Sequence, residues 1–123
     1  MNRTLRILLA DDHRSVLAGL GAILSQDQGL EVVGEASNGQ MAVDLARKLL
    51  PDIVVMDIRM PELNGVEATR LIISDHPEIS VIGLSFHADG SLGAEMQKAG
   101  ACACISKKDP VQALISAIRS CRI

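Results

Sequence analysis

The chain has 123 residues, enough for one domain with a substantial core, and 48% of them are hydrophobic. The net charge of −3, with no cluster of Lys or Arg, argues against a DNA-binding surface, and a single aromatic residue, Phe86, excludes a base-stacking platform. No apolar run approaches the ~20 residues of a membrane span. The three cysteines lack framework spacing, which favours a reducing, cytoplasmic setting.

Five short apolar runs predict β-strands. Most are continuously apolar, as expected for strands covered on both faces. They are residues 5–10, 30–36, 52–57, 80–85 and 101–106. The segments between them have helical periodicity. A βα unit repeated five times predicts a parallel sheet with helices on both faces and right-handed crossovers.

The predicted helices differ in the quality of their apolar faces. The first face comprises Val16, Leu17, Leu20, Ile23 and Leu24. The second comprises Met41, Ala42, Leu45 and Leu49, and Pro51 ends that helix. The last comprises Val111, Leu114, Ile115 and Ile118, after Asp109 as N-cap and Pro110 in the first turn. Segment 88–99 is the weakest and most mobile, because Gly90 and Gly93 each cost roughly 1 kcal/mol and only Leu92, Met96 and Ala99 share a face.

Polar side chains follow four of the five predicted strands. Asp11 and Asp12 follow the first, Asp57 ends the third, Ser85 ends the fourth and Lys107 follows the fifth. Because ligands bind beyond the carboxyl ends of parallel strands, we expect these side chains to converge. Taken singly, Asp12 could equally be a helix cap, Ser85 a turn residue and Lys107 a solvated lysine. The combination is what predicts a functional site.

The chemistry of this combination suits phosphoryl transfer. Converging carboxylates repel one another, so the site is expected to take up a proton or bind a cation. Hard oxygen ligands suit Mg²⁺, and a carboxylate beside it can act as a nucleophile that forms an aspartyl-phosphate. The metal and an ammonium group would neutralise charge on the phosphoryl group, and a hydroxyl one strand away could hydrogen-bond to it.

Four stretches carry a family resemblance: ILLADDH (7–13), VVMDIRMPELNG (54–65), LS (84–85) and AGACACISK (99–107). They closely resemble the receiver domain of bacterial two-component response regulators, and the resemblance covers essentially the whole chain. It implies a flavodoxin-like (βα)₅ fold, a doubly wound parallel α/β sheet with strand order 2-1-3-4-5. Strand two is then the outer edge, which explains why no site group follows it.

The resemblance also implies a role for each site residue. Asp57 is the phosphoacceptor, Ser85 the switch hydroxyl and Lys107, rather than its neighbour, the phosphate-binding lysine. Asp12 binds Mg²⁺ directly or through water, with Asp11 as its partner. Two further Mg²⁺ ligands are Asp57 itself and the backbone carbonyl of Arg59.

The family implies a cytoplasmic switch rather than an enzyme, although such domains assist their own phosphorylation and dephosphorylation. A sensor histidine kinase would supply the phosphoryl group, and a homodimer could form on phosphorylation. The stretches ADDHRSVLAGL and LSFHAD resemble the subfamily followed by a LuxR-type helix-turn-helix domain. We therefore expect residues 1–123 to be a single receiver domain, with no direct contact to nucleic acid or membrane and with the output domain outside this chain.

Two positions depart from the family pattern. Cys104 stands where the family usually has Tyr or Phe, and Lys108 stands where many receivers have proline. Phe86 is therefore a candidate relay from Ser85 to segment 88–99, with a passive Cys104 as the equal alternative. The bulky side chains of Arg59 and His87 should flank the path of an attacking water, so self-dephosphorylation is expected to be slow.

The remaining cysteines and histidines are assigned no site role. Cys102 and Cys104 lie two apart on one strand face, roughly 6.6 Å between Cα atoms, with parallel Cβ vectors that exclude a disulfide between them. Both are predicted to be small core residues. His13 and His76 have no metal-ligand spacing and are predicted to be solvated.

Three other functions fit less well. A haloacid dehalogenase-type phosphatase would place a D-x-D pair after strand one, whereas this chain has adjacent aspartates there and Asp57 after strand three. A flavodoxin-like electron carrier needs a phosphate-cradling loop after strand one, where this chain has two negative charges. A degenerate receiver that only binds other proteins stays possible, although the site residues are all present.

Overall fold

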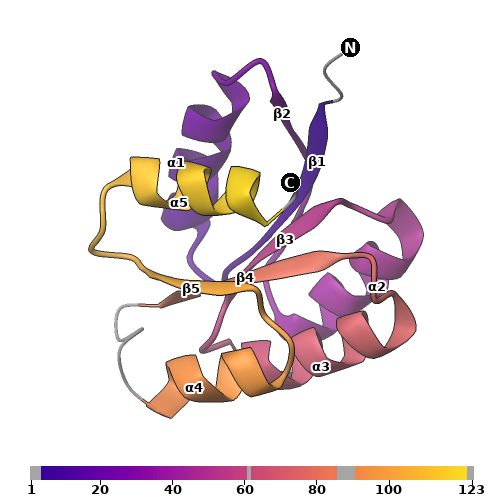
Figure 1. The fold of residues 1–123 in the computed structure, drawn as a ribbon. Helices are drawn as coiled ribbons and strands as arrows, with labels where there is room; N and C mark the ends of the chain where they lie inside the picture. Colours follow the sequence, from indigo (N-terminus) through magenta and orange to yellow (C-terminus); the bar gives the residue numbers. More distant parts are fainter. Residues whose placement is uncertain (1–3, 61, 86–90, 122–123) are drawn as a thin grey trace.

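The computed structural model describes residues 4–60, 62–85 and 91–121. Five parallel strands form one sheet in the order β2-β1-β3-β4-β5, which confirms the predicted topology (Figure 1). The strands are β1 (Leu5–Ala10), β2 (Leu30–Ala36), β3 (Ile53–Asp57), β4 (Ser80–Ser85) and β5 (Ala103–Ser106). The helices are α1 (Arg14–Ser25), α2 (Gly39–Leu49), α3 (Gly65–Asp75), α4 (Ser91–Lys98) and α5 (Val111–Ser120). No helix in these ranges is long and apolar enough to span a membrane.

The sheet separates two hydrophobic cores. Helices α1 and α5 cover one face, and α2, α3 and α4 cover the other (Figure 1). Because successive side chains of a strand point to opposite faces, Ile7 and Leu9 enter the first core while Leu8 and Ala10 enter the second. Every residue of β3 is buried, as its continuously apolar sequence predicts. The site therefore stands on a rigid central strand.

The predicted helix faces are correct at their centres and wrong at two edges. Leu17 and Leu24 of α1 are buried, but Ile23 is 41% exposed and lines a groove of about 220 Å³ between α1 and α5. In α2 the buried residues are centred on Ala42, Val43 and Ala46, while Met41 is exposed. In α5, Leu114 and Ile118 are buried as predicted, with Val111 and Ile115 half-buried. In α4, Met96 is fully buried, as predicted.

Neither Asp12, for which a cap role was the alternative to a site role, nor Asp109, which was predicted as a cap, caps a helix. The N-cap of α1 is His13, without a side-chain cap bond, so Asp12 does not cap that helix. The N-cap of α5 is Pro110, and Asp109 instead accepts a long 3.4 Å hydrogen bond from the Ser106 N–H. The side-chain caps of α2 and α3 come from asparagines in the preceding loops.

The assignment of Cys102 to the core was wrong, whereas the exclusion of a Cys102–Cys104 disulfide was correct. Cys102 is exposed, lies just before β5 and forms a disulfide with Cys121, the C-cap of α5, at a Cα separation of 6.3 Å. Cys104 is free and half-buried, packed against the α2–α4 core. The missed partner follows α5 by one residue, and α5 runs back along β5 so that its C-terminal end lies near the start of that strand. The expectation of unpaired thiols therefore fails for Cys102 and Cys121.

Several sequence-based expectations lie outside the described residues. These are the relay role of Phe86 and the flanking role of His87. The interpretation of segment 88–99 as a weak helix is covered only from Ser91 onward, where α4 begins.

Candidate functional site

The carboxyl edge of the sheet brings together Asp11, Asp57 and Lys107. The ammonium Nζ of Lys107 lies 2.8 Å from Asp11 Oδ2 and 3.3 Å from Asp57 Oδ1. Both aspartates are buried, at 2% and 4% exposure, and the lysine side chain is 7% exposed. The Lys107 N–H donates to the Ser85 carbonyl at 2.7 Å, which holds the loop after β5 against β4. Lys107, and not the exposed Lys108, therefore reaches the carboxylates.

The pKa values of the two buried carboxyl groups are shifted in opposite directions. Burial opposes ionisation of Asp11, but hydrogen bonds from Lys107 and His13 outweigh it and lower its pKa. Burial, reinforced by the negative charge of Asp11, raises the pKa of Asp57 to about 6 despite the opposing effect of Lys107. Lys107 therefore stabilises the ionised form of Asp11 more than that of Asp57, whose negative charge is only partly compensated.

The donor set fits a hard divalent cation. Asp57 Oδ2 is buried and accepts no hydrogen bond from the described residues. Ligand atoms of Asp11, Asp12, His13 and Asp57 all lie within 4.8 Å of one another. A cation there would satisfy the unpaired oxygen and offset the repulsion between carboxylates. Asp12 is 32% exposed, so water has access to the outer side of this cluster.

Sequence reasoning missed His13. Its Nδ1 lies 2.9 Å from Asp11 Oδ1 and 3.1 Å from Asp12 Oδ1, and its backbone N–H donates to Asp11 Oδ1 at 2.9 Å. The hydrogen bond to Asp11 raises the pKa of His13. The ring is 58% exposed, as predicted, and one of its nitrogens lies among the carboxylate oxygens that could hold a metal. The available signal was its position directly after the acidic pair.

The loop after Asp57 is fixed by Gly65. The Gly65 N–H donates to the Ile58 carbonyl at 2.8 Å, and a Cβ at this position would lie 2.2 Å from the Asp57 carbonyl oxygen. Only glycine lets the start of α3 approach the end of β3 this closely. Asn64 caps α3 by accepting a 3.0 Å hydrogen bond from the Glu67 N–H. The turn that follows the strand thus determines where Asp57 lies.

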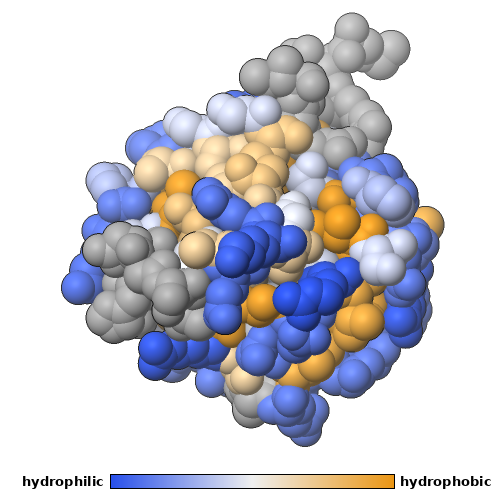
Figure 2. All heavy atoms as spheres, turned by 60° about the horizontal axis from the view of Figure 1, so that its bottom comes forward, coloured by the Kyte–Doolittle hydropathy of each residue, from blue (hydrophilic) through white to orange (hydrophobic). Residues whose placement is uncertain are grey.

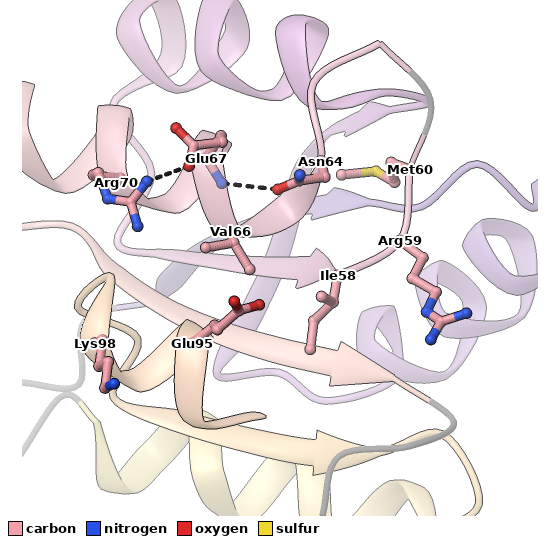
Figure 3. A pocket seen from close by; sticks show the side chains of 9 residues that line it. All are labelled: Ile58, Arg59, Met60, Asn64, Val66, Glu67, Arg70, Glu95 and Lys98. Atoms are coloured by element: carbon pink, nitrogen blue, oxygen red, sulfur yellow. Dashed lines mark hydrogen bonds and ion pairs between the residues drawn. The ribbon is translucent and has the colours of Figure 1, made fainter. Parts of the chain in front are cut away.

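Ser85 and Arg59 lie beside this cluster. Ser85 ends β4 and is 4% exposed, one residue beyond the pairing of Leu84 with Asp57. Arg59 leaves β3 two residues after Asp57, with its side chain exposed (Figure 3). Both residues therefore belong to the same edge of the sheet as Asp57.

A groove of about 880 Å³ lies between this loop and α4. Its nine lining residues are Ile58, Arg59, Met60, Asn64, Val66, Glu67, Arg70, Glu95 and Lys98 (Figure 3). Glu67 and Arg70 form an ion pair along α3, and the Glu95 carboxylate points from α4 toward Val66. On this side of the molecule, hydrophobic strips alternate with hydrophilic side chains (Figure 2). Because the lining mixes apolar, acidic and basic side chains, it does not indicate one class of ligand.

The fold and site define a doubly wound α/β protein with an acidic, lysine-bearing centre at the carboxyl edge of its sheet. Residues 7–119 match the response regulator receiver domain family. The chain belongs to this family, whose members are the receiver domains of two-component systems.

Similar proteins support this assignment. The response regulator UvrY of Escherichia coli is 42% identical over 116 residues, which are 94% of this chain and 53% of UvrY. The transcriptional regulatory protein DegU of Brevibacillus brevis is 39% identical over 94% of this chain and 49% of DegU. The chain thus spans about half the length of these relatives.

Solved structures agree. The response regulator domain of Thermotoga maritima CheB has a TM-score of 0.91 and 32% identity, covering 96% of both chains. A LuxR-family two-component response regulator from an Aurantimonas species also has a TM-score of 0.91, with 33% identity over 96% of this chain and 84% of that one. The subfamily suggested by the sequence is therefore represented among the similar structures.

Proposed function

We propose that this domain accepts a phosphoryl group on Asp57 and uses the modification to control an output domain. The observation that carries the proposal is the buried, unpaired Oδ2 of Asp57 beside a buried lysine. A carboxylate that is not saturated with hydrogen-bond donors keeps a lone pair free for attack on phosphorus, even when a cation is bound to the same carboxylate. The attacking oxygen forms the new P–O bond, and the donor's leaving group departs with its electron pair.

The other site residues stabilise charge on the transferring group. The Lys107 ammonium, 3.3 Å from Asp57, balances negative charge as it builds on the phosphoryl oxygens. Ser85, one residue past the partner of Asp57 on β4, supplies a hydroxyl that hydrogen-bonds to the attached group. Movement of Ser85 toward that group is the first step of the switch.

A Mg²⁺ ion is the proposed cofactor. The residues that would hold it are Asp11, Asp12 and Asp57, together with the Arg59 backbone carbonyl, and it would supply positive charge to the phosphoryl oxygens. Asp11, the partner of Asp12 in this site, is held in place by Lys107 and His13. Asp12, the more exposed aspartate, remains accessible to the cation.

The proposed partners follow from the relatives. A phosphohistidine of a sensor kinase is the physiological donor, and a DNA-binding domain, of the kind named for the LuxR-family neighbour, is the output. The chain itself is the single receiver domain of such a protein and forms a homodimer when phosphorylated. Its proposed cytoplasmic location would expose the Cys102–Cys121 disulfide to reducing conditions, which favour free thiols.

The test is intact mass spectrometry after incubation with a small-molecule phosphodonor. We expect one added phosphoryl group with Mg²⁺, none with a chelator, and none in Asp57→Asn. Asp44→Asn is the matched control, because Asp44 is an exposed carboxylate on α2 that accepts a hydrogen bond from Gln40 and lies outside the site. Equal labelling of Asp57→Asn and wild type would contradict the proposal.

A further inference from the structure

The Cys102–Cys121 disulfide joins the start of β5 to the end of α5, with a Cα separation of 6.3 Å. Cys102 is exposed, and its backbone N–H donates a 2.9 Å hydrogen bond to the Val81 carbonyl, which anchors it to β4. Cys121 is half-buried and packs against the core that α1 and α5 cover. One cysteine of the pair is therefore accessible to solutes, and the other is sheltered.

The two elements that the disulfide joins are otherwise weakly held at these ends. In the described sheet, β5 is an edge strand of four half-buried residues paired with β4. Beyond the buried Ile118, α5 continues with two exposed residues before Cys121. This end is also linked to the domain by the exposed ion pair between Arg119 and Asp27 and by a long 3.5 Å hydrogen bond from Ser80 Oγ to the Cys121 carbonyl. Contacts of these two kinds contribute little, so the disulfide is the strongest restraint on the end of α5.

The third cysteine is a poor competitor for this pair. Cys104 lies two residues after Cys102 and is free and half-buried. Burial raises the pKa of the Cys104 thiol, so little of it is in the thiolate form that attacks disulfides. A thiol that opens the Cys102–Cys121 bond therefore comes from outside the chain.

We propose that Cys102 and Cys121 form a reversible thiol–disulfide exchange site, opened by small thiols such as glutathione, which controls how firmly the end of α5 is held. The inference goes beyond phosphorylation of Asp57 and does not require it. In a reducing compartment, structural disulfides are rare and exposed ones are typically labile and regulatory. The exposed Cys102 places this bond in the second class.

Opening of the bond proceeds in two balanced steps. The thiolate of one glutathione attacks Sγ of the exposed Cys102. The protein S–S bond breaks, a mixed disulfide forms, and Cys121 leaves as a thiolate that takes up a proton. A second glutathione thiolate attacks the glutathione sulfur of the mixed disulfide, which releases Cys102 as a thiolate and gives oxidised glutathione. The two cysteine sulfurs gain the two electrons that the glutathione sulfurs lose, and oxidised glutathione reverses both steps.

The test compares the oxidised and reduced forms of the folded 123-residue chain. The oxidised protein is incubated in native buffer with reduced glutathione, free thiols are trapped with N-ethylmaleimide at intervals, and peptide mass spectrometry locates each adduct. Hydrogen exchange of backbone amides is then measured on both forms. Cys102→Ser, a change at an exposed position, is the permanently open control. Helix α2, on the opposite face of the sheet, is the internal reference.

We expect an intermediate with glutathione on Cys102 and a free thiol at Cys121, and closure of the pair again in oxidised glutathione. The amides of residues 118–121 should exchange about tenfold faster in the reduced protein and in Cys102→Ser than in the oxidised protein, while those of α2 stay unchanged. Reduction that occurs only in denaturant would overturn the inference, because the bond would then be a purely structural one. Equal exchange of residues 118–121 in the oxidised and reduced forms would overturn it as well.

Discussion

The Lys107 ammonium lies 3.3 Å from Oδ1 of Asp57, inside a site that excludes most water. It is also bonded to Asp11 at 2.8 Å, so one lysine holds two buried carboxylates in place. Removing the ammonium leaves both charges uncompensated, which a buried site tolerates poorly. The role of this lysine can be separated from that of its neighbour in the chain.

Lys107→Ala should slow phosphorylation of the domain by about a hundredfold, because a positive group aimed at the developing charge is lost. Lys108→Ala is the matched control, because Lys108 is exposed and its hydrogen bond to Ser106 Oγ comes from the backbone N–H, which alanine keeps. Time courses with a small phosphodonor give both rates. Similar rates for the two variants would refute the assignment of Lys107.

Without divalent cations, Asp57 should make the folded state less stable as pH rises. The folded protein holds the Asp57 proton up to about pH 6, whereas the unfolded chain releases it near the ordinary aspartate pKa of 3.8. The raised pKa therefore favours the folded state at low pH, and this contribution is lost above pH 6, about 3 kcal/mol in all.

Denaturant unfolding of wild type and Asp57→Asn in chelator checks this effect. The variant should be the more stable protein at pH 7, and the difference should vanish near pH 4. Saturating Mg²⁺ should reduce the difference at pH 7, since the ion neutralises the same charge. A variant that is less stable than wild type at pH 7 would show that burying the ionised Asp57 carboxylate does not destabilise the fold.

Gly65→Ala should destabilise the fold by about 1–3 kcal/mol and also slow phosphorylation. The new Cβ would lie 2.2 Å from the Asp57 carbonyl, so the strand end or α3 must move. Gly19→Ala is the control: nothing lies within 4 Å of its added Cβ, and alanine in a helix stabilises by about 1 kcal/mol. Thermal melts and phosphorylation rates of both variants give the answer, and a wild-type rate in Gly65→Ala would refute the positioning role of the turn.

Cys121→Ser should lose about 3 kcal/mol of stability, because the disulfide closes a loop with a sequence separation of 19. Reductant should lower the stability of wild type by the same amount and leave the variant unaffected. Unfolding measured with and without reductant tests this. If reductant does not change wild type, Cys102 and Cys121 are not bonded in solution.

The sequence predicts the sheet well because its signal is local. Continuously apolar runs mark buried parallel strands, and the predicted β1, β2 and β4 have the observed bounds. The predicted third strand begins one residue before β3, and the predicted fifth strand begins two residues before β5. The helix faces were wrong at Ile23 and Met41, since an apolar residue at the edge of a helical stripe can also line a surface groove.

The convergence of Asp11, Asp57 and Lys107 was predictable, because parallel strands deliver their ends to one edge. The parts that failed depend on three-dimensional contacts between loops. The position of His13 depends on how its ring turns toward Asp11 and Asp12, and the Cys102–Cys121 pairing depends on where α5 ends. Asp109 lost its predicted cap role because the chain places Pro110 at the N-cap.

The most direct test of the central claim is to locate the phosphoryl group chemically. An aspartyl-phosphate is an acyl phosphate, and borohydride reduces it to the side-chain alcohol, which peptide mapping then places in the sequence. After incubation with Mg²⁺ and a small phosphodonor, we expect this modification at Asp57 and at no other carboxylate. Modification at Asp11 or Asp12, or phosphate gain with no reduced residue at position 57, would contradict the account.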